Sequence, residues 1–425
     1  MFHRVFYCNV FLLTFLFLKS HLLFAFENLD VASTSAILIN SESESILFEK
    51  NAYQQHYPAS TLKLATALYA YKKIDGNLDV DLVASQEAIG AISWRKKRDS
   101  GYKTPAHWLE FDACHMGIKK GEKLSLRVLF EGMLVASADD AANMIAEYVG
   151  NGSYDEFMTG MNTYLKSIGC LNTNLVNPHG LFHPDQKTTA YDLAIIAKHA
   201  FAIPFIRQTA AKTWVRRPKT NKQDSTVLQQ TNGFIRKGTR FYTPQVVGGK
   251  TGTISKARAL VIVAEDRGRD LVAVVLDAPS VEERYEDIAV MINTAFKEEK
   301  VTKTLISKGK QVYALEIQGA KKTLKTYTKQ ELDVEYFPSG KPLIKGSLYW
   351  DSLTLPVEQG QKVGGVIVKL ADQGITVERS LFAVGKVELT AWSKLKLWVE
   401  RNLNNPSFSI LAVVFVVLLI LIKTS

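Results

Sequence analysis

A serine and a lysine three residues apart, Ser60 and Lys63, are the residues of this chain best suited to nucleophilic chemistry. A serine hydroxyl becomes a useful nucleophile only when a nearby base accepts its proton. On a helix, residues three positions apart share one face, so the lysine amine can reach the serine oxygen. The pattern therefore predicts acyl transfer through Ser60, with Lys63 as the general base.

The chain contains five Ser-x-x-Lys patterns, and their surroundings distinguish them. Ser60 opens an apolar segment, residues 60–72, which predicts a buried helix that carries Lys63 inside it. An unpaired buried lysine is costly, so its presence favours a function. The other four patterns lie in strongly charged segments, where we expect solvated lysines that are poor bases. They begin at Ser93, Ser100, Ser307 and Ser393.

A second candidate is Lys250-Thr251-Gly252, which occurs once, between two glycines and Thr253. It lies where a strand is predicted to begin, and the glycines let a ligand backbone approach closely. The lysine and the threonine hydroxyls can bind a carboxylate, and the strand edge can hold an extended peptide. The alternative is a basic turn that merely precedes a strand.

The elements that position these residues indicate an α+β protein. Alternating apolar residues at 33–49 predict a hairpin, and β-rich runs return after Gly248 on both sides of a polar turn at 266–269. We expect the early and late strands to form one antiparallel sheet covered by helices. The predicted helices are residues 60–72, 124–149, 153–168 and 281–296, and the late strands are residues 260–264 and 271–278.

Residues 301–390 differ in character and predict a separate small all-β domain. Short strands are expected at 311–317 and 363–370, with turns at Pro338-Ser339-Gly340 and at residues 358–360. No cluster of catalytic side chains occurs there, so we expect a spacer or binding role.

Both ends of the chain carry apolar segments. Residues 1–25 fit a signal peptide, with Arg4 before the apolar run. Residues 391–406 are basic and carry two tryptophans, which is typical of an amphipathic juxtamembrane segment. The apolar run at 407–423 predicts a C-terminal membrane helix that anchors an exported body. A buried core helix is the alternative for this run.

The overall composition is that of a globular protein, with 47% apolar and 22% charged residues. A formal charge of +10 fits anionic lipid or wall polymers, and no nucleic-acid-binding signature accompanies it. Cys114 and Cys170 form either one disulfide or two separate thiols. Cys114, His115 and His107 lack a fourth ligand, so no metal is expected. The oligomeric state is not predicted.

A basic stretch at 93–120, beginning with Trp94-Arg95-Lys96-Lys97-Arg98, stands apart from these elements. It is either a solvated insertion loop or a surface that contacts an anionic wall or partner.

Together, Ser60-Thr61-Leu62-Lys63, Ser137-Ala138-Asp139 and Lys250-Thr251-Gly252 resemble the S-x-x-K, S-x-N and K-T-G motifs of penicillin-recognising serine enzymes. The chain looks most like the D-alanyl-D-alanine carboxypeptidases, the low-molecular-mass penicillin-binding proteins. The resemblance covers nearly the whole chain. Further matching segments are Asp140-Ala141-Ala142, Asn177-Pro178-His179-Gly180-Leu181, Thr189 to Ala194, Thr231-Asn232 and Pro356 to Gly360.

This resemblance implies a penicillin-binding/β-lactamase-like domain with a helical subdomain at 30–300. It also implies a location on the periplasmic face of the bacterial cytoplasmic membrane. Ser60 then attacks the penultimate D-alanine of a peptidoglycan stem pentapeptide, Lys63 accepts its proton, and no cofactor is needed. Penicillins and other β-lactams acylate the same serine. The remaining implied roles are a proton relay at Ser137, an oxyanion hole from the backbone N–H groups of Ser60 and Thr253, and substrate binding by Asp139, Lys250, Thr251, Gly252 and Thr253.

One departure from the family pattern is Asp139, which stands where the family has asparagine. An asparagine can donate to a substrate carbonyl, whereas an ionised aspartate only accepts, and it favours the charged form of Lys63. Either Asp139 is protonated, or it pairs with a lysine while another group binds the carbonyl. A DD-endopeptidase, a β-lactamase without the class A glutamate motif, and an inactive wall-binding scaffold are the alternatives to the carboxypeptidase.

Overall fold

The computed structural model describes residues 26, 29–340, 344–370 and 375–402. These residues divide into two compact units. The first covers the described residues up to Glu299 together with Ser339 and Gly340, and the second covers the other described residues from Lys300 onward. All motif residues from Ser60 to Thr253 lie in the first unit.

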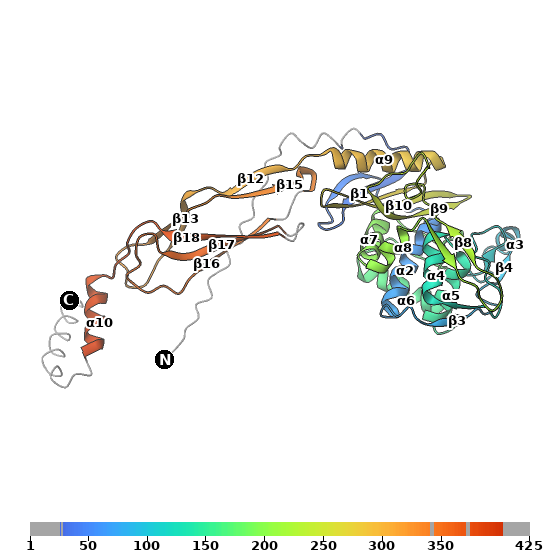
Figure 1. Ribbon diagram of the computed structural model, residues 1–425, viewed down its shortest axis with the longest axis horizontal. Coiled ribbons are helices and arrows are strands. Elements are labelled where there is room, and N and C mark those ends of the chain that lie inside the picture. Colours follow the sequence, from blue (N-terminus) through green and yellow to red (C-terminus); the bar gives the residue numbers. More distant parts are fainter. Residues whose placement is uncertain (1–25, 27–28, 341–343, 371–374, 403–425) are drawn as a thin grey trace. The chain divides into compact units, whose positions relative to one another are not determined.

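The first unit is built on a five-stranded antiparallel sheet whose strands come from both ends of its sequence (Figure 1). Strands β1 (Ser35–Asn40) and β2 (Ile46–Lys50) form the early hairpin. The late strands are β9 (Val246–Ile254), β10 (Ala257–Asp266) and β11 (Arg269–Leu276). The strand order is β2-β1-β11-β10-β9, so β9 lies at one edge. The expected α+β arrangement around one antiparallel sheet is confirmed.

Both faces of this sheet are buried, because successive side chains of a strand point to opposite sides. Ile37 and Val261 pack into the core of the helical subdomain. Leu38 and Leu260 pack on the other face against helix α9 (Val281–Lys297). Figure 1 shows α9 along one face of the sheet and the remaining helices of the unit on the opposite face.

The apolar segment after Ser60 forms the central helix α2 (Lys63–Lys73), and every side chain from Lys63 to Ala70 is buried. A 3-10 turn, η1 (Ala59–Leu62), precedes it and carries Ser60. The buried helix expected there is therefore confirmed, with the serine one turn before its first residue. The helices of the subdomain around it are α4 (Leu126–Val135), α5 (Asp139–Val149), α6 (Tyr154–Ser167), α7 (Ala190–Phe201) and α8 (Pro204–Ala210).

The helix predicted over 124–149 is interrupted, and this interruption carries the second motif. Helix α4 ends at Val135 and α5 begins at Asp139, and Ser137 between them has a left-handed backbone with φ of 63°. The carboxylate of Asp140 accepts hydrogen bonds from the N–H groups of Met116 and Ile118, which fixes the start of α5. Ser137 therefore lies on a strained turn. The sequence pattern had wrongly placed it within a helix.

The basic stretch at 93–120 is more ordered than a solvated loop. It contains helix α3 (Trp94–Asp99), and the side chains of Lys97 and Met116 are buried. The amine of Lys97 donates to the carbonyl of Trp108 at 2.9 Å. Trp94 and Phe111 remain exposed. The loop interpretation is thus wrong for the inner side of the segment, because its buried residues pack against the unit.

Short two-stranded pairs complete the first unit. They are β3 (Asp81–Val83) with β6 (Lys123–Ser125), β4 (Ala91–Ile92) with β5 (Leu109–Glu110), and β7 (Trp214–Arg217) with β8 (Thr226–Gln229).

The second unit is mainly β-structure around its own apolar core, which includes Leu324, Val366 and Leu381. One sheet has the order β13-β14-β18-β17-β16, and β12 pairs with β15. The bounds are β12 (Val301–Ile306), β13 (Gly309–Leu315), β14 (Leu324–Thr328), β15 (Leu332–Tyr336), β16 (Ile344–Trp350), β17 (Lys362–Leu370) and β18 (Ile375–Ala383), with a 3-10 turn η2 (Pro338–Gly340).

Helix α10 (Ala391–Asn402) follows the β strands, and none of its side chains is buried. No helix in the described part of the chain is both long enough and apolar enough to span a bilayer. The signal peptide expected at 1–25 and the membrane helix expected at 407–423 lie outside the described residues.

Candidate active site

Ser60 lies on a tight turn against which two glycines distant in sequence are packed. The preceding residue, Ala59, has a left-handed backbone with φ of 48°, which is unusual outside glycine. A Cβ added at Gly180 would lie 2.1 Å from the carbonyl oxygen of Ala59, and one at Gly252 would lie 3.0 Å from that of Pro58. The loop that contains Gly180 and strand β9 therefore both press against the turn that presents Ser60.

Lys63 lies at the centre of the site, and its side chain is fully buried. Its amine donates to the Oγ of Ser60 at 2.9 Å and to the carbonyl oxygen of His179 at 2.6 Å. The same amine lies 2.5 Å from the Oδ1 of Asp139. The lysine thus touches the serine and the aspartate of the first two motifs at once.

Asp139 is the first residue of α5 and is almost completely buried. Its backbone N–H donates to the carbonyl oxygen of Cys114 at 2.7 Å, which ties the helix start to the basic stretch. Burial raises the pKa of Asp139 above its usual range, and the nearby Lys63 ammonium opposes this shift only in part. Of the two arrangements expected from the sequence, the structure contains the pairing of Asp139 with a lysine.

Lys250 and Ser137 form the second buried contact of the site. The amine of Lys250 donates to the Oγ of Ser137 at 2.9 Å and to the carbonyl oxygen of Thr251 at 2.9 Å. Burial lowers the pKa of Lys250 well below its usual range, and the Lys63 ammonium adds to this effect. A negative group placed beside Lys250 would restore its charged form.

The remaining motif residues follow along β9. Thr251 Oγ1 lies 2.8 Å from Thr231 Oγ1, so both hydroxyls share a hydrogen bond. Thr253 is exposed, and its Oγ1 accepts a hydrogen bond from Arg284 at 2.9 Å. The structure therefore brings the Ser60, Ser137 and Lys250 motifs together beside the edge strand of the sheet.

Two residues of this site were missed by the sequence analysis. Arg284, on α9, is buried and also donates to the carbonyl oxygen of Gly252 at 3.2 Å. It follows Glu282 and Glu283, and such a charged run predicts only a solvated helix face. His179 was noted solely as part of a family-like segment, and burial lowers its pKa well below the usual range. Only its backbone oxygen meets Lys63.

The other Ser-x-x-Lys patterns lie elsewhere, and their lysines are exposed as expected. These are Lys96, Lys103, Lys310 and Lys396. Cys114 is exposed and Cys170 is buried, and both are free thiols, so the two cysteines form no disulfide. Among the described residues, no three histidine, cysteine, aspartate or glutamate side chains gather as a metal site.

Comparisons with known proteins place these motifs in a family context. The profile of the D-alanyl-D-alanine carboxypeptidases, peptidase family S11, matches residues 23–280. The chain is 26% identical over 383 residues to D-alanyl-D-alanine carboxypeptidase DacF of Bacillus subtilis, covering 85% of this chain and 90% of that protein. It is 27% identical over 342 residues to DacD of Escherichia coli, covering 79% and 82%.

Solved structures share the fold. The D-alanyl-D-alanine carboxypeptidase DacD of Francisella tularensis has a TM-score of 0.57 at 21% identity, covering 88% of this chain and 98% of that one. Penicillin-binding protein 5 of Haemophilus influenzae has a TM-score of 0.56 at 23% identity, covering 85% and 98%. At such identities the similarity establishes the α+β fold of the penicillin-binding proteins.

Proposed function

The chain belongs to the D-alanyl-D-alanine carboxypeptidase family of serine peptidases, and we propose that it removes the terminal D-alanine from peptidoglycan stem pentapeptides. The observation that supports this most directly is the buried amine of Lys63, 2.9 Å from the Oγ of Ser60. A fully buried lysine that contacts a serine hydroxyl is arranged for proton transfer, because structural lysines normally keep their amines in water.

In the proposed acylation, the Oγ of Ser60 attacks the carbonyl carbon of the penultimate D-alanine while its proton passes to Lys63. The backbone N–H groups of Ser60 and Thr253 stabilise the oxyanion. The C–N bond then breaks, and the leaving D-alanine takes a proton by way of Ser137, which Lys250 contacts. Water hydrolyses the resulting ester and regenerates Ser60.

Asp139 supplies the protonation state that this step requires. Lys63 accepts a proton only as a neutral amine, and Asp139 lies 2.5 Å away to take the proton that the amine gives up. In a dry site the neutral pair avoids two desolvated charges. Once protonated, Asp139 also has an O–H that can donate to the substrate carbonyl, as the family's asparagine does.

The terminal carboxylate of the substrate fits beside Lys250, Thr251 and Thr253. Arg284 orients Thr253 and adds positive charge at this end of the site. The edge position of β9 leaves a strand that can pair with an extended peptide. β-Lactams acylate Ser60 through the same contacts.

We further propose export and membrane attachment. Residues 1–25 serve as the signal peptide, residues 407–423 as the anchor, and residues 391–406 as an interfacial segment. The exposed Trp392 and Trp398 on α10 support the last assignment, since tryptophan favours the membrane interface. The proposed domain limits are residues 30–300 for the peptidase domain and 301–390 for the β domain.

The test incubates the purified protein with a stem pentapeptide and, separately, with a labelled penicillin. We expect release of free D-alanine and labelling, both lost in Ser60→Ala. Ser307→Ala is the matched control, because Ser307 begins another Ser-x-x-Lys pattern and is exposed. Penicillin labelling without D-alanine release would favour a scaffold or another DD-peptidase activity. Absence of labelling would overturn the role of Ser60.

A further inference from the structure

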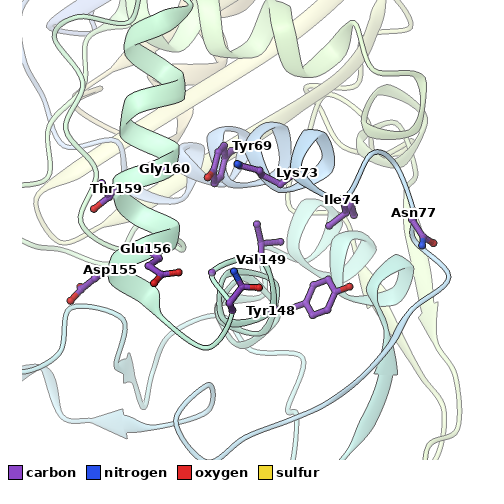
Figure 2. Close-up of a pocket in the computed structure, with 12 residues that line it drawn as sticks. Tyr69, Lys73, Ile74, Asn77, Tyr148, Val149, Asp155, Glu156, Thr159 and Gly160 are labelled. Atoms are coloured by element: carbon purple, nitrogen blue, oxygen red, sulfur yellow. The ribbon is translucent and has the colours of Figure 1, made fainter.

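A groove of about 850 Å³ lies at the end of α2 that is remote from Ser60. Its walls are the last turn of α2, the last turn of α5 and the first turns of α6. Figure 2 shows Tyr69 and Lys73 on α2, Tyr148 and Val149 at the end of α5, and Asp155 to Gly160 on α6 around this space. None of these residues takes part in the proposed peptidase chemistry.

The polar side chains of the groove are free to bind a ligand. Within the described part of the chain, Lys73, Asp155, Glu156 and Thr159 form no side-chain hydrogen bond and no ion pair. Tyr148 presents an exposed ring beside them. Surface groups that stabilise a fold normally pair with one another, whereas these are left facing one space.

The hydroxyl of Tyr69 is a further polar group of the groove. This residue is only 7% exposed, and its hydroxyl has no hydrogen-bond partner among the described residues. A Cβ added at Gly160 would lie 2.0 Å from that oxygen, so the glycine makes room for it. The hydroxyl opens onto the groove that Tyr69 lines, where a ligand can donate to it or accept from it.

The lining favours a neutral, hydroxyl-rich ligand. Lys73 opposes Asp155 and Glu156, so the groove does not present charge of one sign. The side-chain amides of Asn77 and Asn151 donate and accept, and the rings of the tyrosines offer apolar faces. Saccharides combine ring faces with hydroxyl and amide groups, whereas an ionic ligand would require a matching excess of the opposite charge.

A second hollow, of about 390 Å³, adjoins this groove. Asp155 lines both spaces, and Pro178 lines the second one. The next residue, His179, accepts the hydrogen bond from Lys63. Helix α2 spans about 15 Å from Lys63 to Lys73, and the four residues of a pentapeptide ahead of its scissile bond span roughly 13 Å when extended. A polymer that reaches Ser60 with its peptide can therefore extend toward the groove.

We propose that this groove binds the glycan strand of the peptidoglycan whose stem peptide is cleaved at Ser60. The proposal rests on the proposed function, since the peptide reaching Ser60 is what brings the glycan to the groove. It assigns Tyr69, Tyr148 and Asp155 to saccharide recognition and gives the enzyme a preference for glycan-linked over free pentapeptide.

The first test measures binding of a peptide-free saccharide, the β-1,4-linked tetramer of N-acetylglucosamine, to the full chain by calorimetric titration. We expect saturable binding that Tyr148→Ala weakens about tenfold, as for removal of one aromatic contact. Tyr242→Ala is the control, because Tyr242 is 38% exposed and Tyr148 is 40% exposed. Tyr242→Ala should leave binding unchanged.

Tyr69→Phe removes only the hydroxyl and keeps the buried ring. It therefore tests the contribution of the hydroxyl to saccharide binding without leaving a cavity in the core. We expect severalfold weaker saccharide binding with an unchanged melting temperature. Lack of saccharide binding by the native protein overturns the proposal. A second outcome also overturns the proposal: the native protein binds a lysine-rich peptide, loses it at high salt, and does not bind the saccharide.

The second test compares two substrates. Tyr148→Ala should leave kcat/KM on free pentapeptide unchanged and raise KM about tenfold on pentapeptide still attached to soluble glycan strands. Equal KM values for native protein and variant on the glycan-linked substrate contradict the glycan site. If no D-alanine is released at all, the proposed peptidase function fails, and the saccharide titration still decides whether the groove binds glycan.

Discussion

At the scale of single residues, the contact between Lys63 and Asp139 decides how this site works. An asparagine at that position would offer Lys63 a neutral partner, whereas Asp139 offers a group that can hold a proton. The 2.5 Å separation between the amine and the carboxylate, together with the raised pKa of Asp139, favours the proposed proton transfer between the two groups.

Asp139→Asn tests this role. Because an asparagine amide cannot take the proton of Lys63, we expect kcat on pentapeptide at neutral pH to fall about tenfold, a modest part of what general base catalysis contributes. The measurement is steady-state release of D-alanine. A rise in kcat would show that the carboxylate hinders the lysine. Asp140→Asn is unsuitable as a control because the carboxylate of Asp140 accepts hydrogen bonds from the N–H groups of Met116 and Ile118, so Asp155→Asn, remote from Ser60, serves instead.

The pH dependence gives a second readout of the same pair. As pH falls through the pKa of Asp139, its carboxylate becomes protonated and can no longer take the proton of Lys63, so kcat/KM declines. Burial raises this pKa, so the acid limb should lie above the usual aspartate value of about 3.9. We expect Asp139→Asn to abolish this limb. An unchanged acid limb in that variant would assign it to another group.

We propose that Arg284 is a positioning residue that acts through Thr253. Its guanidinium bonds both the hydroxyl of Thr253 and the carbonyl of Gly252, a pair of contacts that a lysine cannot reproduce. We expect Arg284→Lys to raise KM for pentapeptide about tenfold with little change in kcat. Arg240→Lys, at an exposed ion pair with Glu282, is the control. A loss confined to kcat would place Arg284 in the chemical step.

At the scale of elements, the site depends on how closely a loop and a strand approach the turn that carries Ser60. Gly180 and Gly252 lie against that turn from two sides, and neither position has room for a side chain. The left-handed backbone at Ala59 is maintained by this packing, and Ser137 has a left-handed backbone as well. The elements thus fix both serines on short strained turns, where their hydroxyls meet the two lysines.

Gly180→Ala tests this arrangement. Its added Cβ would collide with the carbonyl of Ala59, so we expect the rate of penicillin acylation to fall at least a hundredfold. Gly169→Ala is a matched control, because Gly169 has φ of 94°, Gly180 has φ of 97°, and nothing lies within 4 Å of the added Cβ at Gly169. Both variants carry the same backbone strain, which costs on the order of 1 kcal/mol. Equal acylation rates would contradict the packing argument.

At the scale of the whole molecule, the described residues form two units that differ in what they carry. The first carries every residue of the candidate site, and the second consists of β strands with the exposed helix α10 after them. Helix α10 carries exposed tryptophans and the basic residues Lys394, Lys396 and Arg401, a composition typical of an interfacial helix.

A chain that ends at Asn402 tests α10 without the apolar run that follows it. We expect it to sediment with vesicles that contain anionic phospholipid and to be released by high salt, because basic residues contribute about 1 kcal/mol each near such a surface. A chain that ends at Thr390 should remain in the supernatant, with the same rate on free pentapeptide. Equal sedimentation of both chains would remove the membrane role from α10.

The sequence by itself determined the α+β fold, the central buried helix and the choice of Ser60 among five similar patterns. Those conclusions depend on hydrophobic periodicity and on local composition, which a single sequence displays directly. The resemblance to the family's S-x-N motif identified Asp139 as a departure from the family pattern.

Only the tertiary structure decided which groups meet. The partner of Lys63, the break that presents Ser137, the contact of Arg284 with Thr253 and the groove beneath Tyr69 all join segments distant in sequence. Local patterns carry no information on such contacts, because they arise when the core forces separate elements together. For that reason the pairing of Asp139 with Lys63 was settled by the fold, because the residue types alone left two arrangements open.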